Sequence, residues 1–383
     1  MKYRKFGKLD WEGSALGFGA MRLPLIDSTP ANVNEPLAIQ MIRYAIDHGV
    51  NYIDSAYGYH AGRSESVIGQ ALEGGYRDKV KLATKLPTWM VQSAEDCDRC
   101  LNEQRERLQT DAIDFYLLHG MNKERWSRVK ELKVLRWAEG AMADGRIGHM
   151  GFSFHDDFEA LKEIIDGYDN WTLCQIQYNY MDIEYQAGTR GLKYSADRGL
   201  AVVIMEPLRG GRLSKQPPDS VARLWARTER KRSPAEWALL WVWNHPEVSV
   251  VLSGMSAMEH VVENVDIADS SEPSTLSANE LALIDEVREA YRKLSPVPCT
   301  SCGYCMPCPN GVAISSIFQI YNEAVIYDDP RTGRFRYRGP NGLKEEQRAD
   351  QCTECSDCLE LCPQEIDIPE WLKKAHELLG PRQ

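Results

Sequence analysis

The first 266 residues alternate short apolar segments with longer amphipathic ones, and this alternation constrains the fold more than any other feature. Eight apolar segments have the length of buried strands: 15–19, 51–54, 80–85, 113–119, 148–153, 173–178, 200–206 and 248–253. Each is followed by a segment with helical spacing of its apolar residues: 36–48, 64–72, 94–108, 124–144, 157–166, 189–198, 233–244 and 257–266. Parallel strands need such crossovers, and eight repeats over roughly 250 residues fit a closed (β/α)₈ barrel better than an open sheet.

The overall composition excludes several classes of protein. The chain has 383 residues and a formal net charge of −11, an acidic balance that argues against a nucleic-acid binder. No apolar run approaches the roughly 18 residues that a membrane-spanning helix requires, so we expect no membrane partner. The basic N-terminal stretch lacks the apolar segment of a signal peptide. We therefore expect a cytoplasmic protein.

Ionisable side chains stand where successive strands of the predicted barrel end. Asp54 closes the second strand, Lys85 the third and His119 the fourth. Tyr59 falls on the loop after Asp54, where it can turn back over the barrel mouth. Catalytic groups of such barrels lie at the carboxyl ends of the strands, and a lysine is rarely buried there for stability alone. These residues are therefore candidates for one active site.

Three sequence segments resemble the aldo-keto reductase family. They are NYIDSAYGYHAGRSESVIGQAL, KLATKLP and DAIDFYLLHG, and the resemblance extends over residues 1–290. It implies a catalytic tetrad of Asp54, Tyr59, Lys85 and His119 that reduces an aldehyde or ketone with a nicotinamide cofactor. In that chemistry Tyr59 protonates the developing alkoxide, and Lys85 is expected to lower the pKa of the phenol. Asp54 would pair with Lys85, and His119 would orient the substrate oxygen.

The same resemblance implies a set of cofactor-binding positions. They are Ser153 and Gln175 at the nicotinamide carboxamide, Met205 on the ring, and Gly254, Glu263 and Asn264 toward the adenosine. Gly254 and His260 stand where the family carries a lysine and an arginine that contact phosphate. The chain also has Phe154 where the family has an asparagine. The choice between NADP and NAD stays open, and a flavin is possible but not indicated by any motif.

The cysteines divide the sequence in two, because eight of the eleven lie in the last 85 residues. Cys352, Cys355, Cys358 and Cys362, followed by a proline, match the bacterial ferredoxin spacing C-x₂-C-x₂-C-x₃-C-P. The earlier group consists of Cys299, Cys302, Cys305 and Cys308, and its last gap is one residue shorter. In two-cluster ferredoxins the fourth cysteine of each run binds the other cluster. This spacing predicts two [4Fe–4S] clusters.

The cysteine spacing assigns one cluster to Cys299, Cys302, Cys305 and Cys362. It assigns the other to Cys352, Cys355, Cys358 and Cys308. Two four-cysteine zinc sites and disulfides are the alternatives. We expect a barrel over residues 1–294 and a mainly helical ferredoxin-like domain over 295–383, with a helix in 312–329 and an exposed loop over 331–342.

Three functions follow from these two parts. In the first, the barrel reduces a small-molecule carbonyl with a nicotinamide, and the clusters are structural or sense redox state. In the second, a ferredoxin-like partner feeds electrons through the clusters to the barrel. In the third, the chain is an electron-transfer or redox-sensing protein on a barrel scaffold. A complete tetrad favours the first, and exposed clusters predict oxygen sensitivity. Arg22, Trp89, Trp126 and His155 are expected at the barrel mouth.

Overall fold

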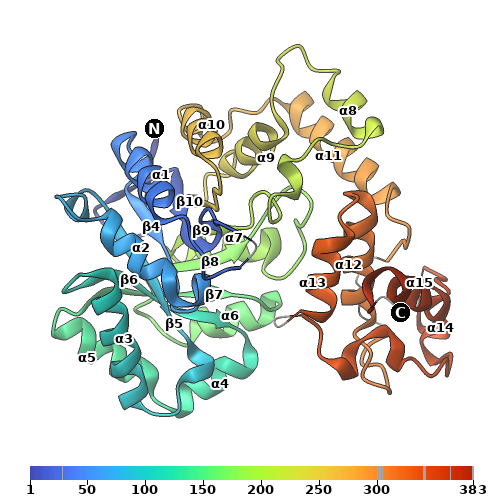
Figure 1. Cartoon of the computed structure of the whole chain (residues 1–383), viewed down its shortest axis with the longest axis horizontal. Coiled ribbons are helices and arrows are strands. Elements are labelled where there is room, and N and C mark those ends of the chain that lie inside the picture. The colour runs from blue at the N-terminus through green and yellow to red at the C-terminus, as the bar shows by residue number, and fades with distance from the viewer. Residues whose placement is uncertain (28, 300–302, 304, 340–341, 363, 382–383) are drawn as a thin grey trace. The chain divides into compact units, whose positions relative to one another are not determined.

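The computed structural model describes residues 1–27, 29–299, 303, 305–339, 342–362 and 364–381 (Figure 1). The chain divides into two compact units. The first comprises residues 1–215 and 232–278, and the second comprises residues 216–231 and 279–383. The boundary after residue 294, expected from the sequence, stays a prediction. Within the described residues, no helix is both long and apolar enough to span a membrane.

Eight parallel strands form a closed barrel in the first unit, as the sequence predicts. They are β3 (Leu16–Gly19), β4 (Tyr52–Asp54), β5 (Lys81–Leu86), β6 (Ile113–Met121), β7 (Ile147–Phe154), β8 (Leu173–Gln177), β9 (Ala201–Met205) and β10 (Val248–Ser253). The barrel closes where β10 pairs with β3, with Ser253 opposite Phe18. Because all strands run parallel, their carboxyl ends meet at one rim.

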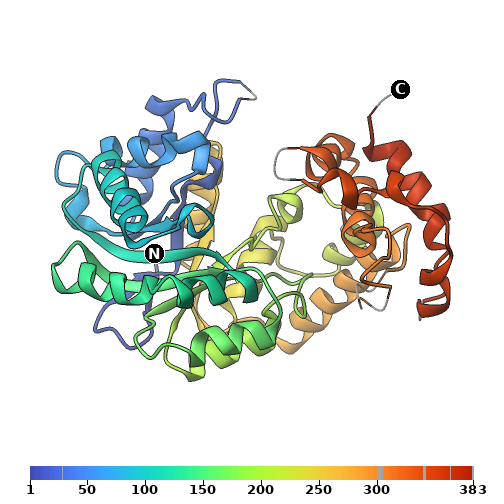
Figure 2. The same ribbon diagram turned by 90° about the horizontal axis from the view of Figure 1, so that it is seen from below.

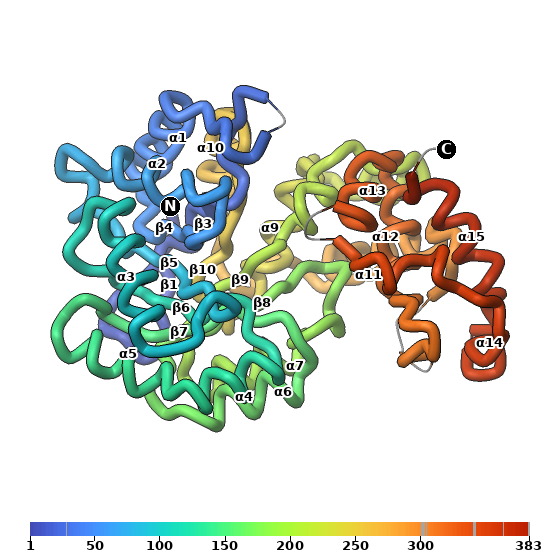
Figure 3. Tube along the Cα trace, turned by 60° about the horizontal axis from the view of Figure 1, so that its bottom comes forward, coloured from blue at the N-terminus to red at the C-terminus, as the bar shows by residue number. Residues whose placement is uncertain are grey.

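Helices surround the strands, as the tube in Figure 3 shows. They are α1 (Glu35–Asp47), α2 (Arg63–Ala71), α3 (Ala94–Leu108), α4 (Lys123–Glu131), α5 (Val134–Ala143), α6 (Phe158–Asp166), α7 (Gly188–Asp197), α9 (Pro234–Trp243) and α10 (Met258–Ala268). The single helix expected over 124–144 is wrong. Lys133 adopts a left-handed conformation with φ of 54°, which ends α4 and starts α5 in a new direction.

An N-terminal hairpin precedes the barrel and was not evident from the sequence pattern. Strands β1 (Tyr3–Lys5) and β2 (Glu12–Ser14) are antiparallel. The loop between them places Phe6, which is fully buried, against Tyr52 at the start of β4 and Phe115 near the start of β6. The hairpin therefore closes the amino-terminal end of the barrel and leaves the carboxyl rim for chemistry.

The second unit is mainly helical (Figure 2). Its helices are α8 (Asp219–Trp225), α11 (Ala278–Lys293), α12 (Ile314–Ile326), α13 (Pro330–Arg338), α14 (Asp357–Leu361) and α15 (Ile368–Leu379). Short 3₁₀ turns occur in the two units at Ala20–Arg22, Tyr59–Gly62, Arg77–Lys79, Thr88–Met90, Arg212–Ser214, Glu345–Gln347 and Ala349–Gln351. An apolar core that includes Phe318 and Leu372 packs against cysteines of both runs.

The loop expected over 331–342 is wrong for its first eight residues, which belong to α13. Asp329 caps this helix by accepting a hydrogen bond of 3.1 Å from the Thr332 backbone, and Pro330 occupies the first turn. Gly333 lets α13 approach its neighbours closely. A Cβ at this position would lie 2.8 Å from Leu379 and 2.9 Å from Ala324. The charged, glycine-containing sequence conceals this helix because it buries little apolar surface.

Candidate active site and cluster cavities

A cavity of about 410 Å³ opens at the carboxyl rim of the barrel. Three members of the expected tetrad line it, and the fourth, Lys85, is fully buried and contacts two of them, Asp54 and Tyr59. All six residues expected to contact the nucleotide line the same cavity. The predicted residues in its wall are Asp54, Tyr59, His119, Ser153, Gln175, Met205, Gly254, Glu263 and Asn264. The structure thus brings together side chains that are as much as 210 residues apart, since Asp54 and Asn264 share one wall.

Lys85 contacts two of the polar residues that line this cavity, Asp54 and Tyr59. Its Nζ donates hydrogen bonds of 2.6 Å to Asp54 Oδ1 and 2.6 Å to the Ser55 carbonyl, and lies 3.4 Å from the Tyr59 hydroxyl. The side chain is fully buried. Burial lowers the pKa of Lys85, but Asp54 and Tyr59 together outweigh it, so that the pKa lies above its usual value. Lys85 is therefore a buried ammonium held in its charged form.

The Tyr59 hydroxyl reaches this ammonium from a strained turn. His60 and Ala61, which follow it, both have φ of 53°, a region that non-glycine residues rarely adopt and that clusters at functional sites. Burial raises the pKa of Tyr59, and the nearby Lys85 is the largest influence that lowers it. Lys85 lowers the pKa of Tyr59, as expected, but burial raises this pKa by more. Tyr59 is consequently a neutral phenol, suited to donate a proton.

His119 faces Tyr59 across the cavity, with ring centroids 6.0 Å apart and the rings edge to face. Burial and the charge of Lys85 hold the pKa of His119 well below its usual value, so the imidazole is neutral. Its Nδ1 is buried and has no hydrogen-bond partner among the described residues. The rings of Trp89 and His119 also pack together, with their centroids 5.0 Å apart. His119 lines the cavity, where a neutral imidazole can hydrogen-bond to a polar substrate atom.

Two of the expected nicotinamide contacts are themselves held by hydrogen bonds. Gln175 Nε2 donates to Asp54 Oδ2 at 3.0 Å, and Ser153 Oγ accepts from the Gly120 amide at 2.8 Å. The side-chain oxygen of Gln175 can therefore still accept a hydrogen bond from a ligand, and the hydroxyl of Ser153 can still donate one. These two positions suit a ligand carboxamide, which carries both a donor and an acceptor.

Glu263 and Asn264, which are expected at the adenosine end, are consecutive residues in the middle of α10. Asn264 Nδ2 donates to Ser253 Oγ at 2.9 Å, and Glu263 accepts from Ser233 Oγ at 2.6 Å. Met205, half-buried, ends β9 in the same cavity wall. Gly254 and His260 are both exposed and contribute no permanent positive charge.

A network of buried hydrogen bonds supports the strand that carries Lys85, and the sequence did not predict it. Gln104 Nε2 donates to the Lys85 carbonyl at 3.1 Å and to Glu65 Oε1 at 2.7 Å. Glu65 also accepts from Thr84 Oγ1 at 2.7 Å and pairs with Arg107. The network fixes the backbone that carries Lys85. Its only sequence signal was Glu65, inside the motif that resembles the reductase family.

Expectations for the cavity mouth are partly wrong. Arg22 and His155 line the cavity, and Trp89 packs beside it on His119. Trp126 does not, because it is 1% exposed on α4 and packs toward Gly167. The loop after β9 was missed: Glu206, Gly210 and Gly211 line the cavity. Its adjacent glycines, both with positive φ, were the available signal.

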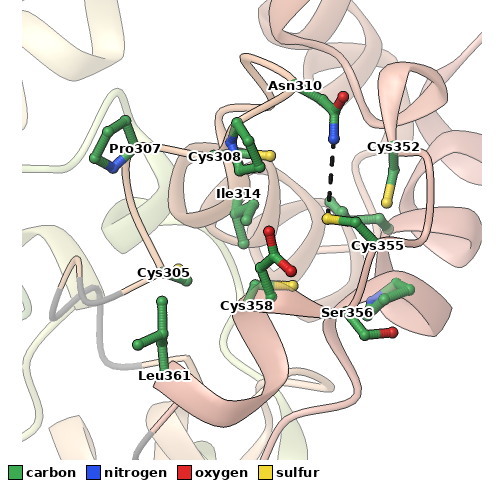
Figure 4. Close-up of a pocket in the computed structure, with 14 residues that line it drawn as sticks. Cys305, Pro307, Cys308, Asn310, Ile314, Cys352, Cys355, Ser356, Cys358 and Leu361 are labelled. Carbon is green, nitrogen blue, oxygen red and sulfur yellow. Dashed lines mark hydrogen bonds between the residues drawn. The ribbon is translucent and has the colours of Figure 1, made fainter.

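The cysteines of the second unit surround two separate hollows. Figure 4 shows the first, around which Cys308 from the earlier run meets Cys352, Cys355 and Cys358 from the later one. The second hollow is lined by Cys299, Cys305 and Cys362. Cys302, the remaining expected ligand, lies outside the described residues. Cys305 also touches the first hollow. Each hollow therefore combines cysteines from both runs, and the crossed assignment of ligands stays a prediction.

These hollows have the chemistry of iron–sulfur sites. Cys308, Cys352, Cys355, Cys358 and Cys362 carry free thiols. Apolar residues complete both walls, including Ile314, which lines each of them. Asn310 Nδ2 lies 3.9 Å from Cys355 Sγ and donates to Thr353 Oγ1 at 2.9 Å. Cysteine sulfurs around a partly apolar space, with an amide donor directed at one of them, fit a bound cluster.

Fold and site together define a barrel oxidoreductase with an appended cysteine-rich unit. The aldo/keto reductase family model matches residues 15–289, and a 4Fe-4S dicluster domain model matches residues 298–366. The chain belongs to the aldo/keto reductase family, and it carries a 4Fe-4S domain after the barrel.

Individual relatives resemble the barrel. The chain is 27% identical over 266 residues to methylglyoxal reductase YeaE of Escherichia coli, covering 66% of this chain and 84% of that protein. The holo aldo-keto reductase AKR11C1 of Bacillus halodurans is 27% identical, with a TM-score of 0.62 over 75% of this chain and 96% of its own. A Klebsiella pneumoniae aldo/keto reductase in complex with NADP and acetate is 28% identical, with a TM-score of 0.58 over 75% and 95%.

Proposed function

We propose that the barrel reduces a small aldehyde or ketone with NADPH or NADH. The observation that carries this proposal is the contact of the buried Lys85 ammonium with both Asp54 and the Tyr59 hydroxyl. A bound nicotinamide supplies the hydride. Tyr59 gives the developing alkoxide its proton, and Lys85 stabilises the phenolate that remains. His119 holds the carbonyl oxygen, and the cavity walls exclude water from the reacting atoms.

The chain's own residues account for nucleotide binding in this proposal. Ser153 and Gln175 would hold the carboxamide, Met205 would cover the ring, and Glu263 with Asn264 would hold the adenosine end. The Klebsiella relative binds NADP, which supports a nicotinamide here. Methylglyoxal is a suitable first carbonyl because a relative is named for its reduction. Both nucleotides should be tried, since the chain has no lysine or arginine at Gly254 and His260, where the family contacts phosphate.

The second unit, we propose, holds two [4Fe–4S] clusters with crossed ligands. Among the described residues, no group of three or more His, Cys, Asp or Glu side chains has the arrangement of a single-ion site. The cysteines instead surround spaces, which favours a cluster over zinc. Oxygen sensitivity and a reducing, cytoplasmic compartment follow as expectations, because thiolates on iron need protection from oxidation.

Paired serine variants test the crossing of ligands. Cys299→Ser and Cys362→Ser should each remove about four of the eight irons expected for two clusters, and their combination should remove no more. Cys299→Ser with Cys358→Ser should remove nearly all. Cys174→Ala, a buried barrel cysteine, is the control and should keep the full iron content. Additive loss in the first pair would contradict the crossed assignment.

The main function is tested by anaerobic mixing of the iron-loaded protein with NADPH or NADH. Consumption of nucleotide only after methylglyoxal or another small carbonyl is added would support the barrel reductase. Failure of both nucleotides to bind would contradict it.

The 4Fe-4S domain favours one second candidate, in which a ferredoxin-like partner supplies electrons through the clusters. Each cluster takes one electron and a hydride carries two, so an intermediate such as a flavin would then be required. Bleaching of the cluster absorption by nucleotide alone would favour this second candidate.

A further inference from the structure

The side chain of Arg22 occupies the space that Gly254 leaves open. A Cβ built on Gly254 would lie 3.1 Å from Cγ and Cδ of Arg22 and 3.2 Å from its Cβ. Such separations are tight contacts, so the stem of Arg22 covers the position from which a side chain at 254 would extend. The two residues come from opposite ends of the barrel sequence, and the pairing of β3 with β10 brings them together.

The guanidinium of Arg22 continues along the cavity wall toward the loop after β9. Its Nη2 lies 3.1 Å from the position of a Cβ on Gly210. Arg22 is exposed, and its guanidinium makes no hydrogen bond or ion pair within the part of the chain that the structure describes. Glu206 lines the same region, with Oε2 3.7 Å from the same Gly210 position. An unpaired cation beside a glycine turn can accept an anionic ligand.

Arg22 lies between the two ends of the proposed dinucleotide site. It follows β3, whose neighbours in the barrel are β4 on one side and β10 on the other. Asp54, at the hydride end, closes β4, whereas Asn264, at the adenosine end, bonds to Ser253, the last residue of β10. A dinucleotide that joins these ends has its diphosphate between them. The anionic part of the ligand would therefore lie beside Arg22.

We propose that Arg22 binds the diphosphate of the nicotinamide dinucleotide and supplies the positive charge that Gly254 lacks. This inference rests on the function proposed above. The planar guanidinium can contact two phosphate oxygens at once, and the absence of a side chain at Gly254 gives it room. Since the diphosphate is common to both nucleotides, Arg22 strengthens binding of NADH and NADPH alike and does not choose between them.

Equilibrium binding to the full, iron-loaded chain tests this proposal directly. NADH and NADPH are titrated anaerobically, and binding is followed by nucleotide fluorescence. Arg22→Ala should raise the Kd for both nucleotides by about tenfold or more, as loss of a charge-assisted contact does. The ratio of the two Kd values should stay unchanged. Arg63→Ala is the control, because Arg63 is an exposed arginine on α2 that pairs with Glu35 and lies outside the cavity wall.

A second variant, the swap variant, moves the positive charge from position 22 to position 254. It tests whether a lost affinity comes from the missing charge itself. Gly254 has no positive φ and tolerates a side chain once the stem of Arg22 is removed. Arg22→Ala combined with Gly254→Lys should recover much of the affinity for both nucleotides. Unfolding midpoints of the variants are measured alongside, and Arg22→Lys, which keeps a charge, should lie between wild type and Arg22→Ala.

Three results would overturn the proposal. They are an unchanged Kd in Arg22→Ala, a loss confined to NADPH, which would assign Arg22 to the 2′-phosphate, and no recovery in the swap variant. These results differ from a failure of the proposed function, in which the wild-type chain itself would bind neither nucleotide.

Discussion

Gln175 donates a hydrogen bond of 3.0 Å to Asp54, and the other oxygen of that carboxylate accepts from Lys85 at 2.6 Å. The residue expected to hold the nicotinamide is thus anchored to the ion pair beside Tyr59. All three residues are at most 3% exposed. The proposed hydride and proton-donor sites therefore share one hydrogen-bonded polar framework, so a change in the ion pair should affect both.

The proton-donor role proposed for Tyr59 is tested by comparing phenylalanine variants of two loop tyrosines. Tyr59→Phe should lower the rate of carbonyl reduction by about 10²- to 10⁴-fold, because the proton donor is lost. Nucleotide affinity should change little. Tyr57→Phe is the matched control, since the Tyr57 hydroxyl donates to Glu103 at 2.6 Å and its residue does not line the cavity. Single-turnover nucleotide oxidation measures both. Equal losses in the two variants would contradict the role of Tyr59.

The pH dependence of reduction should reflect a neutral phenol. Burial raises the pKa of Tyr59 above its ordinary value of about 10. Reduction requires the protonated form, so its rate should stay level through neutral pH and fall only as the pH rises through that pKa. Oxidation of the alcohol should show the opposite trend.

His119 should produce no change in rate near its ordinary pKa of about 6.5, because burial lowers that pKa well below this value. Single-turnover rates between about pH 6 and pH 10 check both statements. A fall in the reduction rate at neutral pH would contradict them.

Removing one partner of the buried Lys85–Asp54 ion pair should destabilise the protein more than replacing both partners with uncharged residues. Lys85→Met leaves Asp54 buried without its partner and should lower the free energy of unfolding by about 3–5 kcal/mol. Adding Asp54→Asn should recover part of this loss. Urea unfolding followed by tryptophan fluorescence measures the difference. Lys79→Met, which breaks an exposed pair with Asp47, should have no measurable effect. A double variant less stable than Lys85→Met would exclude the buried charge as the cause.

Asn310 should raise the reduction potential of the cluster that Cys355 is proposed to bind. An amide donor near a thiolate sulfur stabilises the additional negative charge of the reduced cluster. Asn310→Ala should therefore shift one of the two potentials to a more negative value, seen in a redox titration followed by electron paramagnetic resonance. Gln364→Ala, at the other hollow, is the comparison and should leave this potential unchanged. A shift in the same cluster from Gln364→Ala alone would contradict the assignment.

Gly333 should be required for the packing of α13. Gly333→Val places methyl groups where even a Cβ lies within 2.9 Å of Leu379 and Ala324, and overpacking of this kind costs about 1–3 kcal/mol. The second unit should lose stability and iron while the barrel keeps nucleotide binding. Gly140→Ala on α5, where a Cβ meets no atom within 4 Å, is the control. Unchanged stability of Gly333→Val would show that the helices can move apart.

The sequence predicted the barrel well because parallel strands buried on both faces appear as continuous apolar runs. It drew attention to Asp54, Lys85 and His119 because they stand at strand ends, and their catalytic role stays a prediction. It did not predict α13, which buries only Gly333 and Tyr337 in its nine residues. Nor did it predict the role of Arg22, because that depends on a side chain absent from Gly254, which is remote in the sequence and adjacent only after the barrel closes.

The crossed cysteines have a consequence for how the protein is maintained. Each hollow joins the chain near residue 300 to the chain near residue 360, so a bound cluster would tie together two ends of a long intervening segment. Metal binding of this kind contributes directly to folding. With the clusters bound as proposed, iron supply would govern the lifetime of the second unit, and iron starvation would expose it to proteolysis while the barrel stays folded.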